Sequence, residues 1–410
     1  MAPLYIFLVY LVWFLSIFFV VFLLLLLFSG VPLYETRKWK GKLPFISILV
    51  PAYNEEAKIA YTIDSLKQIT YPHVEFIVIN DGSNDKTSQV VKKAIGTHPK
   101  FAFIDRKENR GKAASLNQGI EHSKGEFIMT MDADSCIEPG IIEKVLPYFQ
   151  EKDVGAVTVS VKVKNPKTFV EKIIEIEYLI GLSLFLKLFS AINCVFVTPG
   201  PFSGYRKSML TEIGGFDKDN IVEDHEIAYR IHKAGYKIKN CMEAAVETIL
   251  PETFKGLYIQ RRRWYSGAVQ TLIQHKNMCF KSKYGLFGYF APFNQILIFF
   301  GLMLFFYTTY MGVTNIIDNV MYFQYVDLDI IERIKDFSFD IFSIQKTWVF
   351  GLSSLAATVV LLFAGLRAVQ VKWKTKKTGV FGYVFMFLLY QIFWIGAYFA
   401  VIKGKKVKWR

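Results

Sequence analysis

An almost unbroken apolar run near the start of the chain constrains the fold more than any other feature of this sequence. Residues 4–28 contain no charged side chain, and the run is about as long as a helix that crosses a bilayer. A cleavable signal peptide would need a basic start and a small-residue cleavage site, and neither is found around the run. The run therefore predicts a retained membrane anchor.

Three more apolar runs, each long enough to cross a bilayer, lie towards the other end, at residues 287–317, 347–366 and 380–402. The stretch between the first run and these three has ordinary soluble character and the size of one domain. We therefore expect an N-terminal transmembrane helix in 1–35, a soluble domain in 36–253, an interfacial helix region in 254–284 and a membrane region of about three spans in 285–410.

The net charge of +14 is compatible with nucleic-acid binding, but the basic residues do not gather on one soluble surface. They cluster beside the apolar runs, at residues 37–42, 372–377 and 403–410. This is the positive-inside pattern of membrane proteins, so it predicts an integral protein of the cell membrane whose soluble domain faces the cytoplasm. The acidic stretch 318–340 would then lie outside.

One inconsistency concerns the basic tail after residue 402. With four simple spans, the tail would emerge on the same side as the acidic stretch, against the positive-inside pattern. Either one run does not cross fully, or the tail breaks the rule.

The soluble stretch alternates between strand and helix patterns. Buried strands are predicted at 46–51, 74–80, 101–104 and 126–131, with helices at 57–68, 87–94 and 113–122. Such alternation predicts an α/β doubly wound, mostly parallel sheet, in which ligands bind at the carboxyl ends of the strands. Polar clusters follow three of the strands at that edge, at Tyr53 to Glu55, at Asp81 and at Asp132 to Asp134.

Asp132 and Asp134 leave a hydrophobic strand together. Alternate residues of an extended chain share a face, so both carboxylates can reach one cation. Carboxylates suit Mg²⁺ or Mn²⁺, which bind few protein groups and complete their shell with phosphates. An isolated pair of this kind is also common in solvated loops.

Glu223 and Asp224 form a second acidic cluster. A carboxylate here could act as general base towards an acceptor hydroxyl. Acidic residues also favour the first turn of a helix, and a helix is predicted over 226–234. Both interpretations are compatible, and His225 fits a packed residue better than a metal ligand.

The segment from Gln260 to Trp264 is the most unusual local sequence. Helical spacing places Gln260 and Arg263 on adjoining turns, arginine suits a diphosphate, and the ring of Trp264 offers a face on which a sugar can stack. The alternative is a basic amphipathic helix on the membrane, which would explain Arg261 and Arg262 but not the glutamine and tryptophan. Amphipathic patterns at 161–188 and 254–274 predict two interfacial helices.

Taken together, these motifs resemble the family-two glycosyltransferases. They are P-A-Y-N-E at 51–55, N-D-G-S-N-D at 80–85, G-K-A at 111–113, D-A-D at 132–134, E-D at 223–224 and Q-x-x-R-W at 260–264. The set is most similar to the membrane-integrated branch that contains cellulose, chitin, hyaluronan and poly-N-acetylglucosamine synthases. This resemblance implies a GT-A-like fold, inverting transfer in one displacement, and Mg²⁺ or Mn²⁺ as cofactor.

The resemblance also implies roles for the matched residues. Asp224 would be the catalytic base, with Glu223 beside it, and Asp134 the more direct metal ligand, with Asp132. The nucleotide sugar would contact Tyr53, Glu55, Asp81, Lys112, Asp132, Gln260, Arg263 and Trp264. The acceptor would contact an acceptor-terminus loop and a tryptophan, comprising Phe202, Ser203, Gly204 and Trp264. Val222 departs from the threonine that many relatives have before Glu-Asp, which bears on substrate detail.

The leading hypothesis is a polysaccharide synthase that transfers a sugar, a UDP-sugar being the expected donor, with export of the chain as an extension of that hypothesis. The alternative is transfer of one sugar to a membrane lipid, since three C-terminal spans are few for a channel. A non-enzymatic membrane scaffold and a nucleic-acid binder are disfavoured. Expected partners are the donor, a saccharide or lipid acceptor and membrane lipid, with a homo-oligomer or an accessory subunit left open. The four scattered cysteines fit a reducing compartment.

Overall fold

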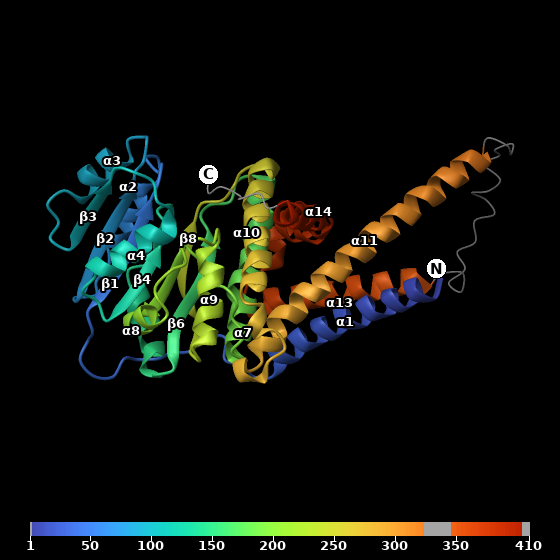
Figure 1. The fold of residues 1–410 in the computed structure, drawn as a ribbon, viewed down its shortest axis with the longest axis horizontal. Helices are drawn as coiled ribbons and strands as arrows, with labels where there is room; N and C mark the ends of the chain where they lie inside the picture. The colour runs from blue at the N-terminus through green and yellow to red at the C-terminus, as the bar shows by residue number, and fades with distance from the viewer. Residues whose placement is uncertain (1, 324–345, 404–410) are drawn as a thin grey trace. The chain divides into compact units, whose positions relative to one another are not determined.

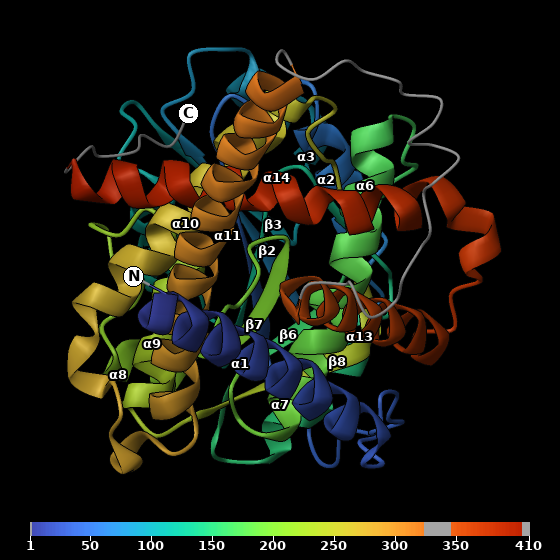
Figure 2. The same cartoon turned by 90° about the vertical axis from the view of Figure 1, so that its right-hand side faces the viewer.

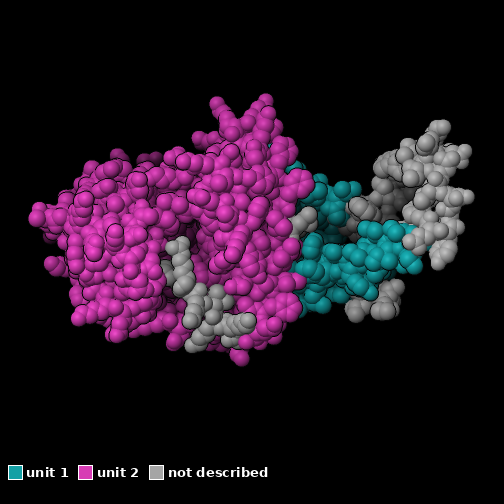
Figure 3. All heavy atoms as spheres, turned by 90° about the horizontal axis from the view of Figure 1, so that it is seen from above, with its two compact units in different colours: residues 1–28, 293–364 teal, residues 29–292, 365–410 magenta. Residues whose placement is uncertain are grey.

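The computed structural model describes residues 2–323 and 346–403, so most of the acidic stretch and the basic tail lie outside the described residues. The chain divides into two compact units (Figure 3). The first unit contains residues 1–28 and 293–364, and the second contains residues 29–292 and 365–410. We describe each unit by itself.

The first unit is built from long apolar helices. They are α1 (Ala2–Phe28), most of α11 (Phe287–Phe323) and most of α13 (Lys346–Ala368). Trp13 of α1 donates from its indole nitrogen to the Ser353 hydroxyl of α13 at 2.9 Å. Three stretches are long and apolar enough to cross a membrane, Ile6–Phe28, Phe287–Asp318 and Gly351–Ala368, which agrees with three of the four predicted spans.

The second unit is organised around an eight-stranded mixed sheet in the order β3-β2-β1-β4-β7-β6-β8-β5 (Figure 1). The strands are β1 (Ile46–Ala52), β2 (Val74–Asp81), β3 (Phe101–Arg106), β4 (Phe127–Met131), β5 (Ser135–Ile137), β6 (Val154–Val163), β7 (Phe202–Arg206) and β8 (Lys237–Thr248).

The first four strands in that order run parallel, as the alternating pattern predicts. Their connections are α2 (Ile59–Lys67), α3 (Thr87–Ile95) and α4 (Lys112–His122). Alternate residues of β1 face opposite sides: Ile48 joins the core that includes α2, whereas Leu49 meets Gly119 of α4. Helices therefore cover both faces, and the predicted α/β fold is confirmed.

The other half of the sheet is partly antiparallel. β7 pairs antiparallel with both β4 and β6, and β6 pairs parallel with β8. Phe202, Ser203 and Gly204, expected in a loop, are instead in strand β7, where the side chains of Phe202 and Ser203 are buried. The loop lies just before them, because β7 begins where the Pro199 to Pro201 turn ends.

The predicted interfacial helix at 161–188 is only partly correct. Residues up to Val163 belong to β6, and the helical part is α6 (Phe169–Glu177), followed by π-helical turns over Tyr178–Phe185 and then by α7 (Leu186–Ala191). Thr168 and Glu171 form a capping box that starts α6. The short helices α5 (Ile141–Val145) and α8 (Lys207–Glu212) complete the sheet connections.

Three further helices border the functional part of this unit. α9 (Glu223–Lys233) begins three residues earlier than predicted, so Glu223 and Asp224 lie in its first turn. α10 (Phe254–Gln274) has the bounds of the second predicted helix, whose interfacial position stays a prediction. α14 (Lys377–Ile402), expected to be the fourth span, lies across both α6 and α10 (Figure 2).

Candidate active site

The loops that follow β1 and β2 are joined by hydrogen bonds. Asn54, in the left-handed region at φ 54°, donates its backbone N–H to the Ser83 hydroxyl at 2.9 Å and accepts from the Asn84 N–H at 2.9 Å. The N–H of Glu55 donates to the Thr87 hydroxyl at 2.8 Å. Tyr53 and Glu55 are thus held at the carboxyl edge of the sheet, where the sequence places them.

Asp81 is 3% exposed and organises the neighbouring loop. Its carboxylate accepts from the Arg106 guanidinium at 2.9 Å and from the backbone N–H groups of Arg110 and Gly111 at 3.0 and 2.8 Å. These bonds fix the turn that leads into α4 and places Lys112 at the start of that helix.

Lys112 connects two acidic clusters that are far apart in the sequence. Its Nζ lies 2.6 Å from Oδ1 of Asp132 and 2.8 Å from Oε1 of Glu223. Burial lowers the pKa of Lys112, but the carboxylates of Asp132, Glu223 and Asp224 outweigh burial and hold it well above its usual range. The ammonium therefore stays charged and draws the end of β4 and the start of α9 together.

Asp132 and Asp134 lie on either side of buried Ala133, with side chains 28% and 21% exposed. The backbone oxygens of Ala133 and Ser135 accept from the Thr62 hydroxyl, which holds the segment in shape. Asp134 lies 3.4 Å from Lys58 Nζ. Two accessible carboxylates fit a divalent cation that takes its other ligands from phosphate and water. No cluster of three or more ligating side chains was found among the described residues.

Asp224 is held in the first turn of α9 by its own backbone. Its carbonyl oxygen accepts from both the N–H and the hydroxyl of Thr198, at 3.0 and 2.9 Å. Burial and the adjacent Glu223 carboxylate raise the pKa of Asp224 to about 7, against the opposing charges of Lys112 and Arg263. Burial also disfavours the charged form of Glu223, but the contact with Lys112 prevails and lowers its pKa. The two adjacent carboxylates therefore differ chemically, and Asp224 has the properties of a general base.

The middle arginine of the α10 motif is buried. Arg261 is 0% exposed, pairs with Glu177 at 2.7 Å, and places its guanidinium 4.2 Å from the Trp264 ring centre. The membrane-surface interpretation is therefore wrong for this residue. Gln260 accepts from Arg261 at 2.9 Å, and Arg263 acts electrostatically on Glu223 and Asp224, so α10 borders the carboxylate cluster.

Two glycines that the sequence analysis did not single out lie at close approaches in this region. A Cβ on Gly200 would lie 2.7 Å from Lys112 Nζ and 2.8 Å from Asp132 Oδ2. A Cβ on Gly267 of α10 would lie 2.0 Å from Cγ2 of Val222. Only a proline on each side of Gly200 hints at a fixed turn, and no local signal marks Gly267.

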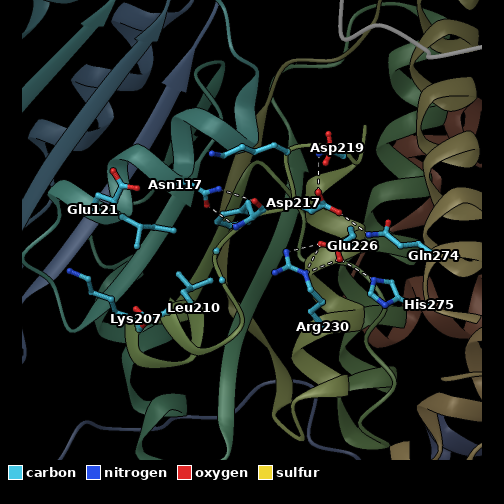
Figure 4. Close-up of a pocket in the computed structure, with 16 residues that line it drawn as sticks. Asn117, Glu121, Lys207, Leu210, Asp217, Asp219, Glu226, Arg230, Gln274 and His275 are labelled. Carbon is cyan, nitrogen blue, oxygen red and sulfur yellow. Dashed lines mark hydrogen bonds and ion pairs between the residues drawn. The ribbon is translucent and has the colours of Figure 1, made fainter. Parts of the chain in front are cut away.

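A separate cleft of about 730 Å³ lies beside α9 (Figure 4). None of the sequence-predicted site residues lines it. At one side of this cleft, Glu226 pairs with Arg230 of its own helix and with His275, just after α10, at 2.7 and 2.9 Å. Asp217 accepts from Gln274 at 2.8 Å. The contact of Glu226 with His275 joins α9 to the end of α10, and that of Asp217 with Gln274 joins the loop before α9 to the same place.

Comparison with known families identifies the sheet domain. The profile of Glycosyl transferase family 2 matches residues 47–214, which covers the loops after β1, β2 and β4 and the strand β7. The chain carries a family 2 glycosyltransferase domain and is a glycosyltransferase. The matched segment ends before Asp224 and before α10.

The similarity to known proteins extends beyond the segment that the family profile matches. A poly-beta-1,6-N-acetyl-D-glucosamine synthase of Staphylococcus epidermidis is 28% identical over 85% of this chain and 80% of its own length. The synthase of the same name from Staphylococcus aureus strain COL is 34% identical over 58% of each chain. The chain thus spans little more than half the length of this second relative.

A solved mannosyltransferase from Pyrobaculum calidifontis, in complex with GDP-Man and Mn²⁺, has a similar fold. The TM-score is 0.63 at 18% identity, and the match covers 98% of this chain and 99% of the other. The likeness supports the fold assignment of this glycosyltransferase.

The charge state of Asp224 predicts the pH dependence of the glycosyltransferase. A general base must be deprotonated, so kcat/KM should fall as pH drops below about 7 and level off above it. Replacing Lys112 by methionine removes a charge that lowers the pKa of Asp224, so the inflection should move to higher pH. Steady-state kinetics across this range tests both statements. A flat profile would contradict the assignment.

The contact between Gly267 and Val222 predicts a sterically coupled pair. Gly267→Ala should push α10 away from the first turn of α9, destabilise the protein by about 1–3 kcal/mol and lower activity. Val222→Ala should restore part of both in the double variant, because it removes the Cγ2 atom 2.0 Å from the added Cβ but keeps the Val222 Cβ at 2.7 Å. Thermal unfolding and turnover are measured, with Gly181→Ala, where a Cβ meets open space, as control. Additive losses in the double variant would rule out the coupling.

Proposed function

We propose that this glycosyltransferase extends a polysaccharide at a membrane, using a nucleotide-diphosphate sugar as donor. The observation that carries the proposal is the joining of Asp132, Lys112 and Glu223 beside Asp224, whose pKa is raised to about 7. This arrangement provides cationic and carboxylate groups for a diphosphate next to a poised base. The names of the staphylococcal relatives favour N-acetylglucosamine as the sugar. UDP is the nucleotide expected from the sequence.

In the proposed reaction, an acceptor hydroxyl attacks the anomeric carbon of the donor and passes its proton to the Asp224 carboxylate. The bond from that carbon to the diphosphate oxygen breaks, and the nucleoside diphosphate leaves with the electron pair. One displacement inverts the anomeric centre and needs no covalent intermediate. Arg263 and Trp264 on α10 would contact the diphosphate and the acceptor sugar, with Gln260 beside them.

Tyr53, Glu55 and Asp81 are proposed to serve the nucleoside, Asp81 by fixing the loop beside it. Asp132 and Asp134 would hold Mg²⁺ or Mn²⁺, which offsets negative charge on the departing diphosphate. The Mn²⁺ in the complex of the archaeal mannosyltransferase supports a divalent cation. The turn before Phe202, together with Gly204 and Ser203 of β7, would shape the acceptor side.

The candidate spans and the basic clusters beside them support a cell-membrane location with the catalytic domain in the cytoplasm. Transfer of one sugar to a membrane lipid is the second candidate. The likeness to a mannosyltransferase solved with GDP-Man is a reason to test GDP-sugars as donors as well.

The test is nucleotide release by the purified protein in lipid, screened across UDP- and GDP-sugars with Mg²⁺, Mn²⁺ or a chelator. We expect metal-dependent release with UDP-N-acetylglucosamine and a polymeric product on sizing. A single-sugar lipid product would favour the second candidate. Absence of release with every donor, with lipid and saccharide acceptors present, would overturn both.

A further inference from the structure

The last apolar helix, α14, is attached along its length to the catalytic unit. Near its start, Lys376 pairs with Glu175 of α6 at 2.5 Å. A Cβ on Gly379 would lie 2.3 Å from the Lys172 carbonyl oxygen, and one on Gly382 would lie 2.6 Å from Ile173. The first half of α14 therefore lies directly against α6.

The second half of α14 lies against α10. Trp394 stacks on Tyr265 with ring centres 4.1 Å apart and planes 4° from parallel. Phe393 packs against Tyr258, and the Ala397 carbonyl accepts from the Ser266 hydroxyl at 3.4 Å. Met386 and Phe393 belong to the same buried core as the strands of the sheet.

A buried charged cluster joins all three helices at the middle of α14. Glu177, at the end of α6, pairs with Arg261 of α10 and accepts a hydrogen bond from the Tyr390 hydroxyl of α14. If α14 crossed the bilayer, this ion pair would lie near the hydrocarbon centre, where charged side chains are costly.

The two helices against which α14 packs, α6 and α10, belong to the catalytic unit and not to the membrane-spanning helices. α6 carries the charged residues Glu171, Lys172, Glu175 and Glu177, and α10 carries three consecutive arginines. Neither helix is among the candidate spans of the described residues. Helices packed on one sheet domain stay on one side of the membrane. Both ends of α14 must therefore lie on that side.

The face of α14 that points away from α6 and α10 is apolar, as expected of a face that contacts lipid. Five of its aromatic and aliphatic side chains are at least half exposed, Phe381, Phe385, Ile392, Phe399 and Ile402. Lysines flank the helix at Lys372, Lys374 and Lys403, as at a membrane surface. The candidate span Gly351–Ala368 ends shortly before α14, so the chain is already at the bilayer where α14 begins. The helix is apolar all round because one face meets protein and the other meets lipid.

We propose that α14 lies along the membrane surface and does not cross it. Three helices of the described residues then cross, and Ile402, the last residue of α14, lies on the side of the catalytic domain. The 49° bend in this helix fits a surface path better than a straight span. Lys403, directly after α14, then lies on the side of the other basic clusters, as the positive-inside pattern requires.

Sealed vesicles in which the protein has one orientation test on which side of the membrane α14 ends. Cleavable epitopes are placed at the N-terminus, after Arg410 and in the exposed turn at Thr97. We expect the C-terminal and Thr97 sites to be cleaved from the same side and the N-terminal site to be protected there. Cleavage of both terminal epitopes from the side opposite to the Thr97 site would overturn the proposal.

A depth measurement tests the surface path independently. Spin labels are attached at cysteines replacing Phe381, Ile392 or Phe399, after the two partly exposed cysteines, Cys136 and Cys279, are changed to serine. All three labels should lie at a similar shallow depth, whereas a label at Met303 of α11, the control, should lie deep. A label at Ile392 as deep as that at Met303 would contradict a surface helix.

Discussion

Replacing Asp224 by asparagine should lower the rate of sugar transfer by about 10²–10⁴-fold while the protein folds normally. Asparagine has nearly the same shape but cannot accept the acceptor proton. The contacts that hold Asp224 in place are those of its backbone carbonyl with Thr198, and the substitution keeps them. Single-turnover transfer and donor affinity should be measured separately, because the loss should fall on the chemical step.

Asp64→Asn is the matched control for this substitution, since its exposed carboxylate pairs at the surface with Lys67 of the same helix. Glu223→Gln provides a second comparison. It weakens the contact with Lys112, so it should affect donor binding more than the chemical step. Wild-type rates in Asp224→Asn would exclude Asp224 as the base.

Replacing Arg261 by methionine should destabilise the protein by about 3 kcal/mol, because the largely buried Glu177 carboxylate would lose its cation. The same change removes the guanidinium that packs on the Trp264 ring. Acceptor use should therefore decline along with stability. Thermal unfolding in detergent and the KM for acceptor are the measurements.

Arg262→Met is a close control, because Arg262 is only partly buried and its guanidinium lies 5.5 Å from the Tyr258 ring centre. Its effect should stay below about 1 kcal/mol. Removing both charges, in Arg261→Met with Glu177→Met, should recover much of the stability. Equal losses in Arg261→Met and Arg262→Met would refute the importance of the buried pair.

Local patterns predicted the parallel half of the sheet well. β1, β2 and β4 are short apolar runs followed by polar loops, and each was placed within two residues. The antiparallel half was missed because its pairing is non-local. Nothing in the sequence around Phe202 indicates that this strand lies between β4 and β6, and the local residues alone predict a loop.

The same difference between local and non-local contacts explains why only part of the candidate site could be predicted. Convergence of Asp81 and Asp132 follows from strand direction alone, whereas the Lys112 bridge to Glu223 requires the tertiary fold. The burial of Arg261 depends on α6 and α14, which are distant in sequence. Likewise, an apolar helix such as α14 matches a membrane span by composition, and only its partners distinguish a surface helix. The residue roles themselves stay predictions.

The hydrogen bonds between the loops after β1 and β2 have a consequence for redesign. Asn54 is hydrogen-bonded to both Ser83 and Asn84, so the two loops hold each other in place. If these loops hold the nucleobase, as proposed, their mutual bonds reduce the ordering that binding would require on the protein side. A substitution of Asn54 or Ser83 should therefore disturb both loops at once, because each supplies the side-chain acceptor for the other loop.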